Sequence, residues 1–319
     1  MHLLATISGT IPDGSAAVDL AQTPGDIVLL SSADTELALL AAAQARLRAQ
    51  DPAVPGLRLA SILQLGHNFS VDLYAETVAA ARLVITRLLG GSAYWPYGVE
   101  RLVETCAAHG IPLALLPGDD KPDPELADLS TLPSDAVRRL WRYLVEGGPA
   151  NAENLLRYAG LLIGHETVWA EPAPLLRAGL YWPDRTLPSL DEIAAEWRGA
   201  GGLVPIVFYR ALVQSGNTAP VDTLVDALST RRLRPLPIFV QSLKDGEATA
   251  LLATALAAAP PAVILNATGF SVRASAASDP LAAADCPILQ VVFAGNDEES
   301  WHAGTRGLGA RDIAMNVAL

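Results

Sequence analysis

The stretch Ile27–Ala49, "IVLLSSADTELALLAAAQARLRA", decides the fold class of this chain. It begins with a short run of branched apolar residues, typical of a buried strand, and continues as an alanine-rich segment of helical period. The same order returns several times in the first half, which predicts βα units on a parallel sheet covered by helices on both faces. The predicted strands are Leu3–Ile7, Ile27–Ser31, Leu57–Ser61, Leu83–Arg87 and Pro112–Leu116, and the predicted helices are Ala33–Ala49, Val71–Ala80 and Tyr97–His109.

The second half restarts this pattern after a stretch of different character. Two amphipathic helices are predicted between residues 134 and 163, followed by a connection rich in Pro, Gly and Trp at Glu171–Leu187. We predict two flavodoxin-like or Rossmann-like parallel-sheet domains, residues 1–133 and 201–319, joined by a helical section and linker at 134–200. The later strands are predicted at Gly202–Tyr209, Leu236–Gln241, Val263–Ala267 and Ile288–Ala294, with helices at Ala219–Ser229 and Glu247–Ala258.

Composition and charge exclude several classes of protein. The net charge is -12, and only two of the 22 basic residues, Lys121 and Lys244, are lysines. A surface of this sign repels polyphosphates, which argues against nucleic acid and anionic membranes as partners. The longest uncharged stretch, Ala248–Val272, is split by two prolines and predicts a buried helix and strand instead of a membrane span. Two distant cysteines exclude a disulfide scaffold, so a reducing cytoplasm is expected.

An acidic corner, "PGDDKPDP" at Pro117–Pro124, follows a predicted strand, where ligands bind in open α/β sheets. Asp119, Asp120 and Asp123 could ligate a hard divalent cation, or Lys121 could pair with a substrate carboxylate. The alternative is a turn whose aspartates bond their own backbone. His67, in "LGHNFS" after another strand, is the one histidine expected to act as a ligand or an acid/base group, unless it only bonds a loop carbonyl. The metal candidates are therefore His67, Asp119 and Asp120.

A second candidate site is "LLGGSAYWPYG" at Leu88–Gly98, which also follows a strand. Its paired glycines let the backbone approach a ligand closely, and Tyr94 and Trp95 offer flat apolar surfaces with polar tips. These features suit a large planar molecule. The alternative is a helix start with Pro96 in the first turn, the aromatic rings filling the groove between helices.

A third candidate site lies in "FYRALVQSGNTAPVDTL" at Phe208–Leu224. The strand delivers Tyr209 and Arg210 to its carboxyl end, Ser215 and Asn217 lie in a polar loop, and the next helix offers its first N–H groups. This assembly favours a carboxylate, with Arg210 as a bidentate partner. The alternative is a capped crossover with a surface arginine. Asn266, in "NATGFS" after a later strand, starts a similar loop.

Several motifs are missing from the sequence. It contains no G-x-x-x-x-G-K-[ST], so we expect no P-loop in this chain. It also lacks a G-x-S-x-G nucleophile elbow and an early G-x-G-x-x-G after a strand. These absences lower the expectation of a serine hydrolase or a dinucleotide-dependent oxidoreductase.

Taken together, "QTPGDIVLLSSADTEL", "LLGGSAYWPYG", "LPGDDKPDP", "EGGPANAENLLRYAG" and "FYRALVQSGNTAPVDTLVDAL" resemble the N-terminal region of the cobaltochelatase large subunit of CobN type. That family is related to the H subunit of magnesium chelatase. The resemblance is collinear from Met1 to Leu319, and family members are much longer. The uncapped ending "ARDIAMNVAL" agrees with an expectation that this chain is the front portion of such a subunit. One departure is in "LSTRRLRPLPIFV", where the family usually has a glycine near Arg232 that ends a helix.

The resemblance implies insertion of Co2+, as substrate, into hydrogenobyrinic acid a,c-diamide during cobalamin biosynthesis. It also implies two AAA+-type partner subunits that bind ATP and Mg2+, which agrees with the missing P-loop. The substrate-binding candidates in this chain are Tyr94, Trp95, Tyr209, Arg210, Ser215, Asn217 and Asn266. No catalytic residue is carried over, and the insertion chemistry is expected downstream of Leu319, which would leave this chain inactive alone.

Two other functions stay open on the sequence. The chain could be a docking scaffold for the ATPase partners that does not touch the substrate. It could also be a stand-alone two-domain α/β protein that closes over a small organic acid.

Overall fold

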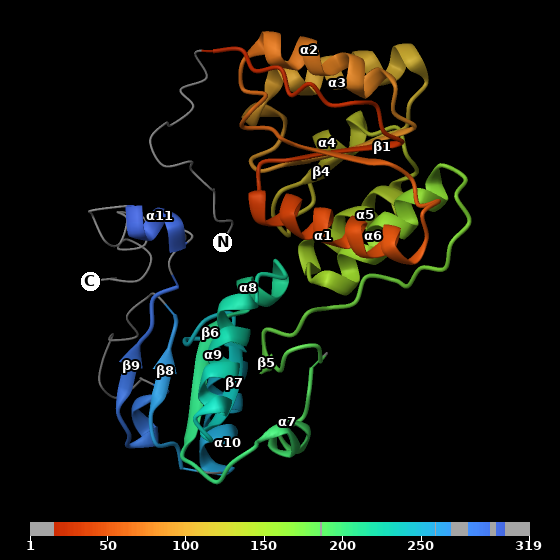
Figure 1. Cartoon of the computed structure of the whole chain (residues 1–319). Coiled ribbons are helices and arrows are strands. Elements are labelled where there is room, and N and C mark those ends of the chain that lie inside the picture. The colour runs from red at the N-terminus through yellow and green to blue at the C-terminus, as the bar shows by residue number, and fades with distance from the viewer. Residues whose placement is uncertain (1–15, 186, 259, 269–279, 294–297, 304–319) are drawn as a thin grey trace. The chain divides into compact units, whose positions relative to one another are not determined.

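The computed structural model describes residues 16–185, 187–258, 260–268, 280–293 and 298–303. These residues form two compact units, each built on its own sheet (Figure 1). Unit 1 contains the described residues up to Leu175 together with Gln214–Gly216, and unit 2 contains the others. The predicted strand Leu3–Ile7 and the ending "ARDIAMNVAL" lie outside the described residues.

Unit 1 is a four-stranded parallel sheet in the order β2-β1-β3-β4, with helices on both faces (Figure 1). The strands are β1 (Ile27–Ser31), β2 (Leu57–Ser61), β3 (Leu83–Leu88) and β4 (Leu113–Pro117). One face is covered by α2 (Asn68–Ala79), α3 (Pro96–His109) and α4 (Pro124–Leu129), and the other by α1 (Asp34–Gln50), α5 (Ser134–Glu146) and α6 (Pro149–Leu162). A short 3-10 helix, η1 (Ser92–Tyr94), precedes α3.

Strand β1 shows why its sequence is apolar at every position. Ile27 and Leu29 belong to the core on the side of α1, α5 and α6, whereas Val28 and Leu30 belong to the core on the side of α2 and α3. Successive side chains of a strand point to opposite faces, so a sheet covered on both faces needs apolar residues throughout. The α/β prediction is confirmed by this arrangement.

Helices α5 and α6 pack on the first sheet instead of forming a section of their own. Val137, Leu140 and Leu144 on α5 lie in the same core as Leu116 of β4. The predicted section 134–200 is thus divided, with these helices in unit 1 and the residues from Leu176 onward in unit 2. The physical reason is that an apolar helix stripe needs a partner surface, and the open face of the sheet supplies it.

The segment after α6 is tied to the helical layer by side chains. Asn154 accepts a hydrogen bond from the Ala170 N–H (2.8 Å), and Asn151 exchanges bonds with the backbone of Ala173 (3.0 and 2.8 Å). The Tyr143 hydroxyl donates to the Ala170 carbonyl. We call residues 167–173 the strap, because they lie across α5 and α6 without belonging to either helix.

Arg139 fastens the same strap from α5. Its Nε donates to both carboxylate oxygens of Glu171 (3.1 and 2.9 Å). The guanidinium also lies 5.0 Å from the ring centres of Tyr158 and Trp169, within the range of a cation–π contact. The hydrogen bond from Arg139 lowers the pKa of the Glu171 carboxyl.

Unit 2 contains a five-stranded sheet in the order β5-β7-β6-β8-β9, in which only β5 runs antiparallel (Figure 1). Its strands are β5 (Ala178–Leu180), β6 (Leu203–Tyr209), β7 (Arg234–Val240), β8 (Ile264–Asn266) and β9 (Ile288–Gln290). Residues of α7 (Leu190–Glu196) and α10 (Gly246–Ala258) pack on one face, and those of α8 (Arg210–Gln214) and α9 (Ala219–Thr230) on the other. The remaining elements are η2 (Ala282–Ala284) and α11 (Glu298–Ala303).

Strand β5 lies inside the segment that was predicted to be only a connection. It pairs with the carboxyl half of β7, and Gly179 faces Phe239 in the register. A Cβ atom at Gly179 would lie 2.5 Å from the Phe239 ring, so only glycine allows this close approach. In the described residues, no helix combines the length and the apolar character needed to span a membrane.

Two helix ends use the left-handed backbone conformation. Gly110 follows α3 with φ 64, the left-handed conformation in which a glycine commonly ends a helix. Arg232 follows α9 with φ 60, a conformation that favours glycine and costs an arginine about 1 kcal/mol. The turn after α9 therefore keeps a glycine-like geometry although this chain has arginine there.

One buried hydroxyl in unit 1 gives a stability prediction. Thr86 of β3 is fully buried between Leu30 and Leu115 of the neighbouring strands, and its Oγ1 has no hydrogen-bond partner among the described residues. Thr86→Val should raise the free energy of unfolding by about 1 kcal/mol, because valine keeps the shape without an unpaired hydroxyl. Urea denaturation monitored by circular dichroism measures the change.

Thr77→Val is the matched control for that substitution. The Thr77 hydroxyl donates to the Gln22 carbonyl (3.3 Å), so its removal should lower the free energy of unfolding. A loss of stability in Thr86→Val as large as in Thr77→Val would show that the Thr86 hydroxyl has a partner after all.

Candidate functional site

The carboxyl edge of the second sheet is the ligand position that the topology of unit 2 defines. From β6 the chain crosses to β7 on one side, and it then returns to β8 on the other side of β6. In open α/β sheets, ligands bind outside the carboxyl ends of strands that diverge in this way. The ends of β6 and β8, Tyr209 and Asn266, were both predicted site residues, and the structure brings these two strand ends together at one edge.

A small polar network occupies the β8–β9 side of this edge. Asn266 and Gln290 are the last residues of their strands and stand opposite each other in the parallel register. Asn266 Nδ2 donates to Gln290 Oε1 (3.2 Å), and Asn266 Oδ1 accepts from the N–H (3.1 Å) and hydroxyl (2.7 Å) of Thr268. Gln290 Nε2 donates to the Thr268 carbonyl (2.9 Å). Buried Thr268 therefore holds two amide side chains in place.

Arg210 lies on the β6 side of the same edge. It is the first residue of α8, directly after Tyr209 at the end of β6. Its Nε donates to the Leu176 carbonyl (2.9 Å), which fixes the position of the guanidinium. A guanidinium has five N–H donors in a planar arrangement, the geometry that matches a carboxylate.

Ser215 and Asn217 lie in the loop between α8 and α9. Ser215 belongs to the segment Gln214–Gly216, which is grouped with unit 1, whereas Asn217 belongs to unit 2. The exposed Asn217 donates its backbone N–H to the Leu212 carbonyl (2.9 Å) and so closes the turn after α8.

The first turn of α9 already contains a carboxylate of the chain itself. Asp222 accepts hydrogen bonds from the Tyr181 hydroxyl (2.6 Å) and the Thr218 hydroxyl (3.2 Å). Burial, followed by the bond to Asp222, raises the pKa of Tyr181. A second anion at this helix start would meet the Asp222 charge, so the helix does not supply the anion site that the sequence suggested.

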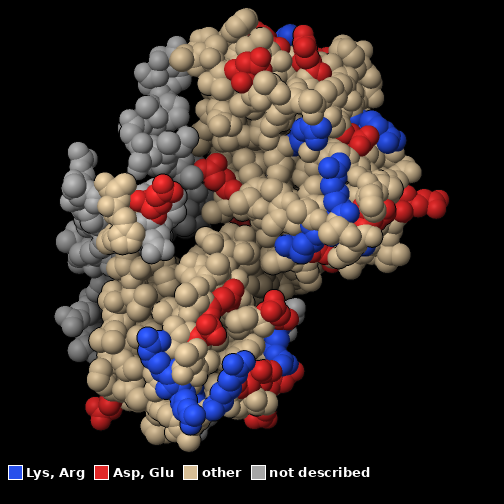
Figure 2. Space-filling view, viewed as in Figure 1, with Lys and Arg blue, Asp and Glu red and all other residues tan. Residues whose placement is uncertain are grey.

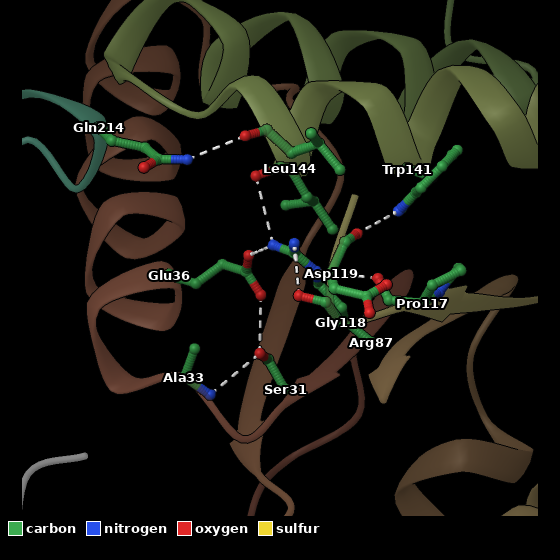
Figure 3. A network of polar contacts seen from close by, with 11 residues as sticks. Ser31, Ala33, Glu36, Arg87, Pro117, Gly118, Asp119, Trp141, Leu144 and Gln214 are labelled. Atoms are coloured by element: carbon green, nitrogen blue, oxygen red, sulfur yellow. Dashed lines mark hydrogen bonds and ion pairs between the residues drawn. The ribbon is translucent and has the colours of Figure 1, made fainter. Parts of the chain in front are cut away.

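The carboxyl edge of the first sheet is closed by a buried ion pair (Figure 3). There β1 and β3 diverge, and Arg87 at the end of β3 pairs with Glu36 of α1. The two side chains are 6% and 7% exposed. Ser31 at the end of β1 donates its hydroxyl to the other Glu36 oxygen (2.7 Å) and accepts from the Ala33 N–H (3.1 Å).

Arg87 also binds three carbonyl oxygens. It donates to Pro117 (3.2 Å), Gly118 (3.0 Å) and Leu144 (3.2 Å), which belong to the end of β4, the following loop and the last turn of α5 (Figure 3). The side chains of this chain therefore fill the place where a ligand would bind in unit 1.

The acidic corner after β4 has the geometry of a turn. Asp119 accepts from the Lys121 N–H (3.1 Å), and its carbonyl accepts from the Trp141 indole (3.0 Å). Asp123 caps α4 through the N–H groups of Glu125 and Leu126 (3.0 and 3.2 Å). These bonds correspond to the alternative in which aspartates bond the local backbone.

The three metal candidates are not gathered in one place. His67 caps α2 through a bond between Nδ1 and the Phe69 N–H (3.1 Å). His67 follows β2, whereas Asp119 and Asp120 follow β4. These two strands form opposite edges of the sheet and lie about 14 Å apart at the usual strand spacing. Among the described residues, no three His, Cys, Asp or Glu side chains form a group suited to a metal ion.

Tyr94 and Trp95 have different surroundings. Trp95 is 6% exposed, packs in the core with Leu102, and donates its indole N–H to the Leu65 carbonyl (2.9 Å). Its ring is therefore part of the core, as in the alternative that the sequence left open, and cannot stack on a ligand. Tyr94 is 43% exposed and lies beside Gly90.

The sequence reasoning missed the polar groups that organise both edges. Arg87 and Glu36 were not singled out, although a charged residue in a strand of buried residues is a signal of an internal ion pair. Gln290 was missed as well. The predicted strand Ile288–Ala294 put Gln290 inside the strand, whereas β9 ends at this residue.

Neither positive nor negative side chains dominate the face that Figure 2 shows. Arginine and lysine side chains lie among aspartates and glutamates there, and uncharged residues form most of the surface. Recognition at this face would therefore depend on particular side chains more than on a broad field.

The mostly parallel sheets have helices on both faces, and their chain paths diverge at the carboxyl ends of the strands. These features place the chain in the class of doubly wound α/β proteins. A family model described as CobN/Magnesium Chelatase matches residues 141–319, more than half of the chain. Along its whole length the chain is 44% identical to the aerobic cobaltochelatase subunit CobN of Sinorhizobium sp. and 40% identical to the subunit of the same name from Pseudomonas aeruginosa. The chain belongs to the CobN/magnesium chelatase family, which confirms the resemblance seen in the sequence.

A solved structure agrees with this assignment at the level of the fold. The catalytic subunit of cobaltochelatase from Mycobacterium tuberculosis superposes with a TM-score of 0.70 at 24% identity, covering 91% of this chain and 23% of that one. The chain likewise spans 26% of the length of each of the two CobN relatives.

Proposed function

We propose that this chain is the N-terminal part of the large subunit of an ATP-dependent cobaltochelatase. The complete enzyme would insert Co2+ into hydrogenobyrinic acid a,c-diamide in the cytoplasm, with ATP and Mg2+ bound by two AAA+-type partner subunits. The observation that carries the proposal is the identity of 44% and 40% along the whole chain to two proteins named as aerobic cobaltochelatase subunits.

The role we assign to this chain is to hold part of the macrocycle. Inserting a divalent ion requires the ring nitrogens to lose protons and the ion to lose water, which demands a fixed ring. Arg210 would bind a peripheral carboxylate at the edge of the second sheet. The chain spans 26% of its relatives, so we assign the insertion itself to the whole subunit with its partners.

A titration of the 319-residue chain with hydrogenobyrinic acid a,c-diamide tests the proposal. Saturable quenching of the fluorescence of its six tryptophans at micromolar pigment, about -8 kcal/mol, would support a macrocycle site in this chain. A folded chain that does not bind the pigment but captures the ATPase subunits would instead be a docking scaffold.

Arg210→Ala should weaken pigment binding by about 1 to 3 kcal/mol, because a charged hydrogen-bonding partner of the carboxylate is lost. Arg210→Lys should recover only part of the affinity, since an ammonium group lacks the planar fork. The same fluorescence titration measures both variants.

Arg231→Ala is the control for charge alone. Arg231 is exposed at the end of α9 and bonds the Ala227 carbonyl (2.8 Å), away from the carboxyl ends of the strands. If Arg231→Ala weakens binding as much as Arg210→Ala, or if Arg210→Ala binds like the original chain, Arg210 does not contact the pigment.

A further inference from the structure

The amide pair of Asn266 and Gln290 has a fixed orientation. The Thr268 N–H must face an oxygen, which sets Asn266 Oδ1 toward it (3.1 Å). The Thr268 carbonyl must face a donor, which sets Gln290 Nε2 toward it (2.9 Å). Backbone groups therefore decide which end of each amide is nitrogen, and the remaining bond, from Asn266 Nδ2 to Gln290 Oε1 (3.2 Å), agrees with both.

This pair retains unused hydrogen-bonding capacity. Both lone pairs of Asn266 Oδ1 are used by Thr268, whereas Nδ2 uses one of its two N–H groups. Gln290 Nε2 likewise uses one of two N–H groups, and Oε1 uses one of two lone pairs. Within the part of the chain that the structure describes, two donors and one acceptor of this pair are thus left without a partner, on a half-buried Asn266 and an exposed Gln290.

That inventory matches a particular chemical group. A primary carboxamide accepts through its oxygen and donates through its nitrogen, so it can satisfy donors and the acceptor together. A carboxylate offers only acceptors, and its oxygen would face the Gln290 Oε1 lone pair with no proton between them. A ligand that pairs all of these oriented groups is therefore favoured over one that leaves the Gln290 oxygen to water.

We propose that Asn266 and Gln290 form a binding site for a primary carboxamide group of a ligand, with Thr268 as the positioning residue. The site lies at the carboxyl ends of β8 and β9, next to the end of β6, where the topology puts a ligand. The ligand class follows from the side chains alone. Its application to an amidated macrocycle rests on the proposed function.

The experiment compares two pigments that differ only in whether two of their side chains end in carboxamides or in carboxylates. Hydrogenobyrinic acid a,c-diamide and unamidated hydrogenobyrinic acid are titrated separately into the 319-residue chain, with tryptophan fluorescence as the readout. The original chain should bind the diamide about 10-fold more tightly than the acid, the effect of one or two net hydrogen bonds.

Gln290→Lys should reverse this preference, because an ammonium group donates to a carboxylate and offers no acceptor to an amide. Gln290 is an exposed residue at the end of an edge strand, so the substitution leaves the core intact. Gln241→Lys is the matched control. Gln241 is also exposed and follows β7 at the same edge, so the control adds the same charge beyond β6 and away from the amide pair.

Reversal in Gln290→Lys with an unchanged ratio in Gln241→Lys is the expected result. Equal binding of the two pigments by the original chain, or an equal change in both variants, would overturn the carboxamide site and leave the proposed function standing. If neither pigment binds the folded original chain, the proposed macrocycle role fails, and this inference fails with it.

Discussion

Arg87→Met should lower the free energy of unfolding of unit 1 by about 3 to 5 kcal/mol, the largest effect we expect from a single side chain. The substitution removes the partner of buried Glu36 and the donor to three carbonyl oxygens at once. An unpaired carboxylate in a position 7% exposed is strongly unfavourable. Urea denaturation of the original and variant chains measures the loss.

A second substitution separates the charge from the packing. Glu36→Gln in the Arg87→Met background removes the unpaired charge, so it should recover part of the lost stability. Arg46→Met serves as the surface control, because the Arg46–Glu153 pair (2.6 Å) is partly exposed and should contribute at most about 1 kcal/mol. If Arg46→Met and Arg87→Met lower the free energy of unfolding by the same amount, the buried Arg87–Glu36 pair does not contribute more than a surface pair.

Gly98→Ala should lower the free energy of unfolding by about 3 kcal/mol, although alanine favours a helix over glycine. A Cβ atom at this position in α3 would lie 2.0 to 2.2 Å from three ring atoms of Trp95. The ring cannot move aside easily, because it is buried and its indole N–H is bonded to Leu65. Thermal or urea unfolding measures the effect.

Gly160→Ala should have the opposite effect in α6, on the other face of the first sheet. A Cβ atom there would meet its nearest neighbours, in His165 and Pro55, at 3.4 and 3.6 Å, which is ordinary contact. The helix preference of alanine should then raise stability by about 0.5 to 1 kcal/mol. Adding Trp95→Leu to Gly98→Ala should relieve the clash, and a Gly98→Ala chain as stable as the original would show that the ring can shift.

Most helices and strands could be predicted from the sequence. Each sheet is covered on both faces, and this burial sets the pattern of apolar residues within each segment. β1 coincides with its predicted range, since a parallel strand covered on both faces is buried at every position. β5 could not be found in this way. It has three residues, and its reason to be a strand is the edge of β7, which lies about sixty residues further along the chain.

The candidate site shows the same division between local and distant causes. Topology could be anticipated, so Tyr209, Arg210 and Asn266 were placed correctly at strand ends. Trp95 was misjudged as a candidate because the carbonyl that holds its indole belongs to Leu65, in a different loop. A single sequence carries no information on such pairs, and a buried aromatic residue resembles a ligand-binding one.

The strap has a consequence for where this chain can be shortened. A chain ending at residue 133 would lose α5 and α6 and expose one face of the first sheet to water. A chain ending after α6 would still deprive Tyr143, Asn151 and Arg139 of their partners in the strap. The shortest piece that keeps these partners extends through Ala173, so a polypeptide ending there is the smallest practical starting point for unit 1 alone.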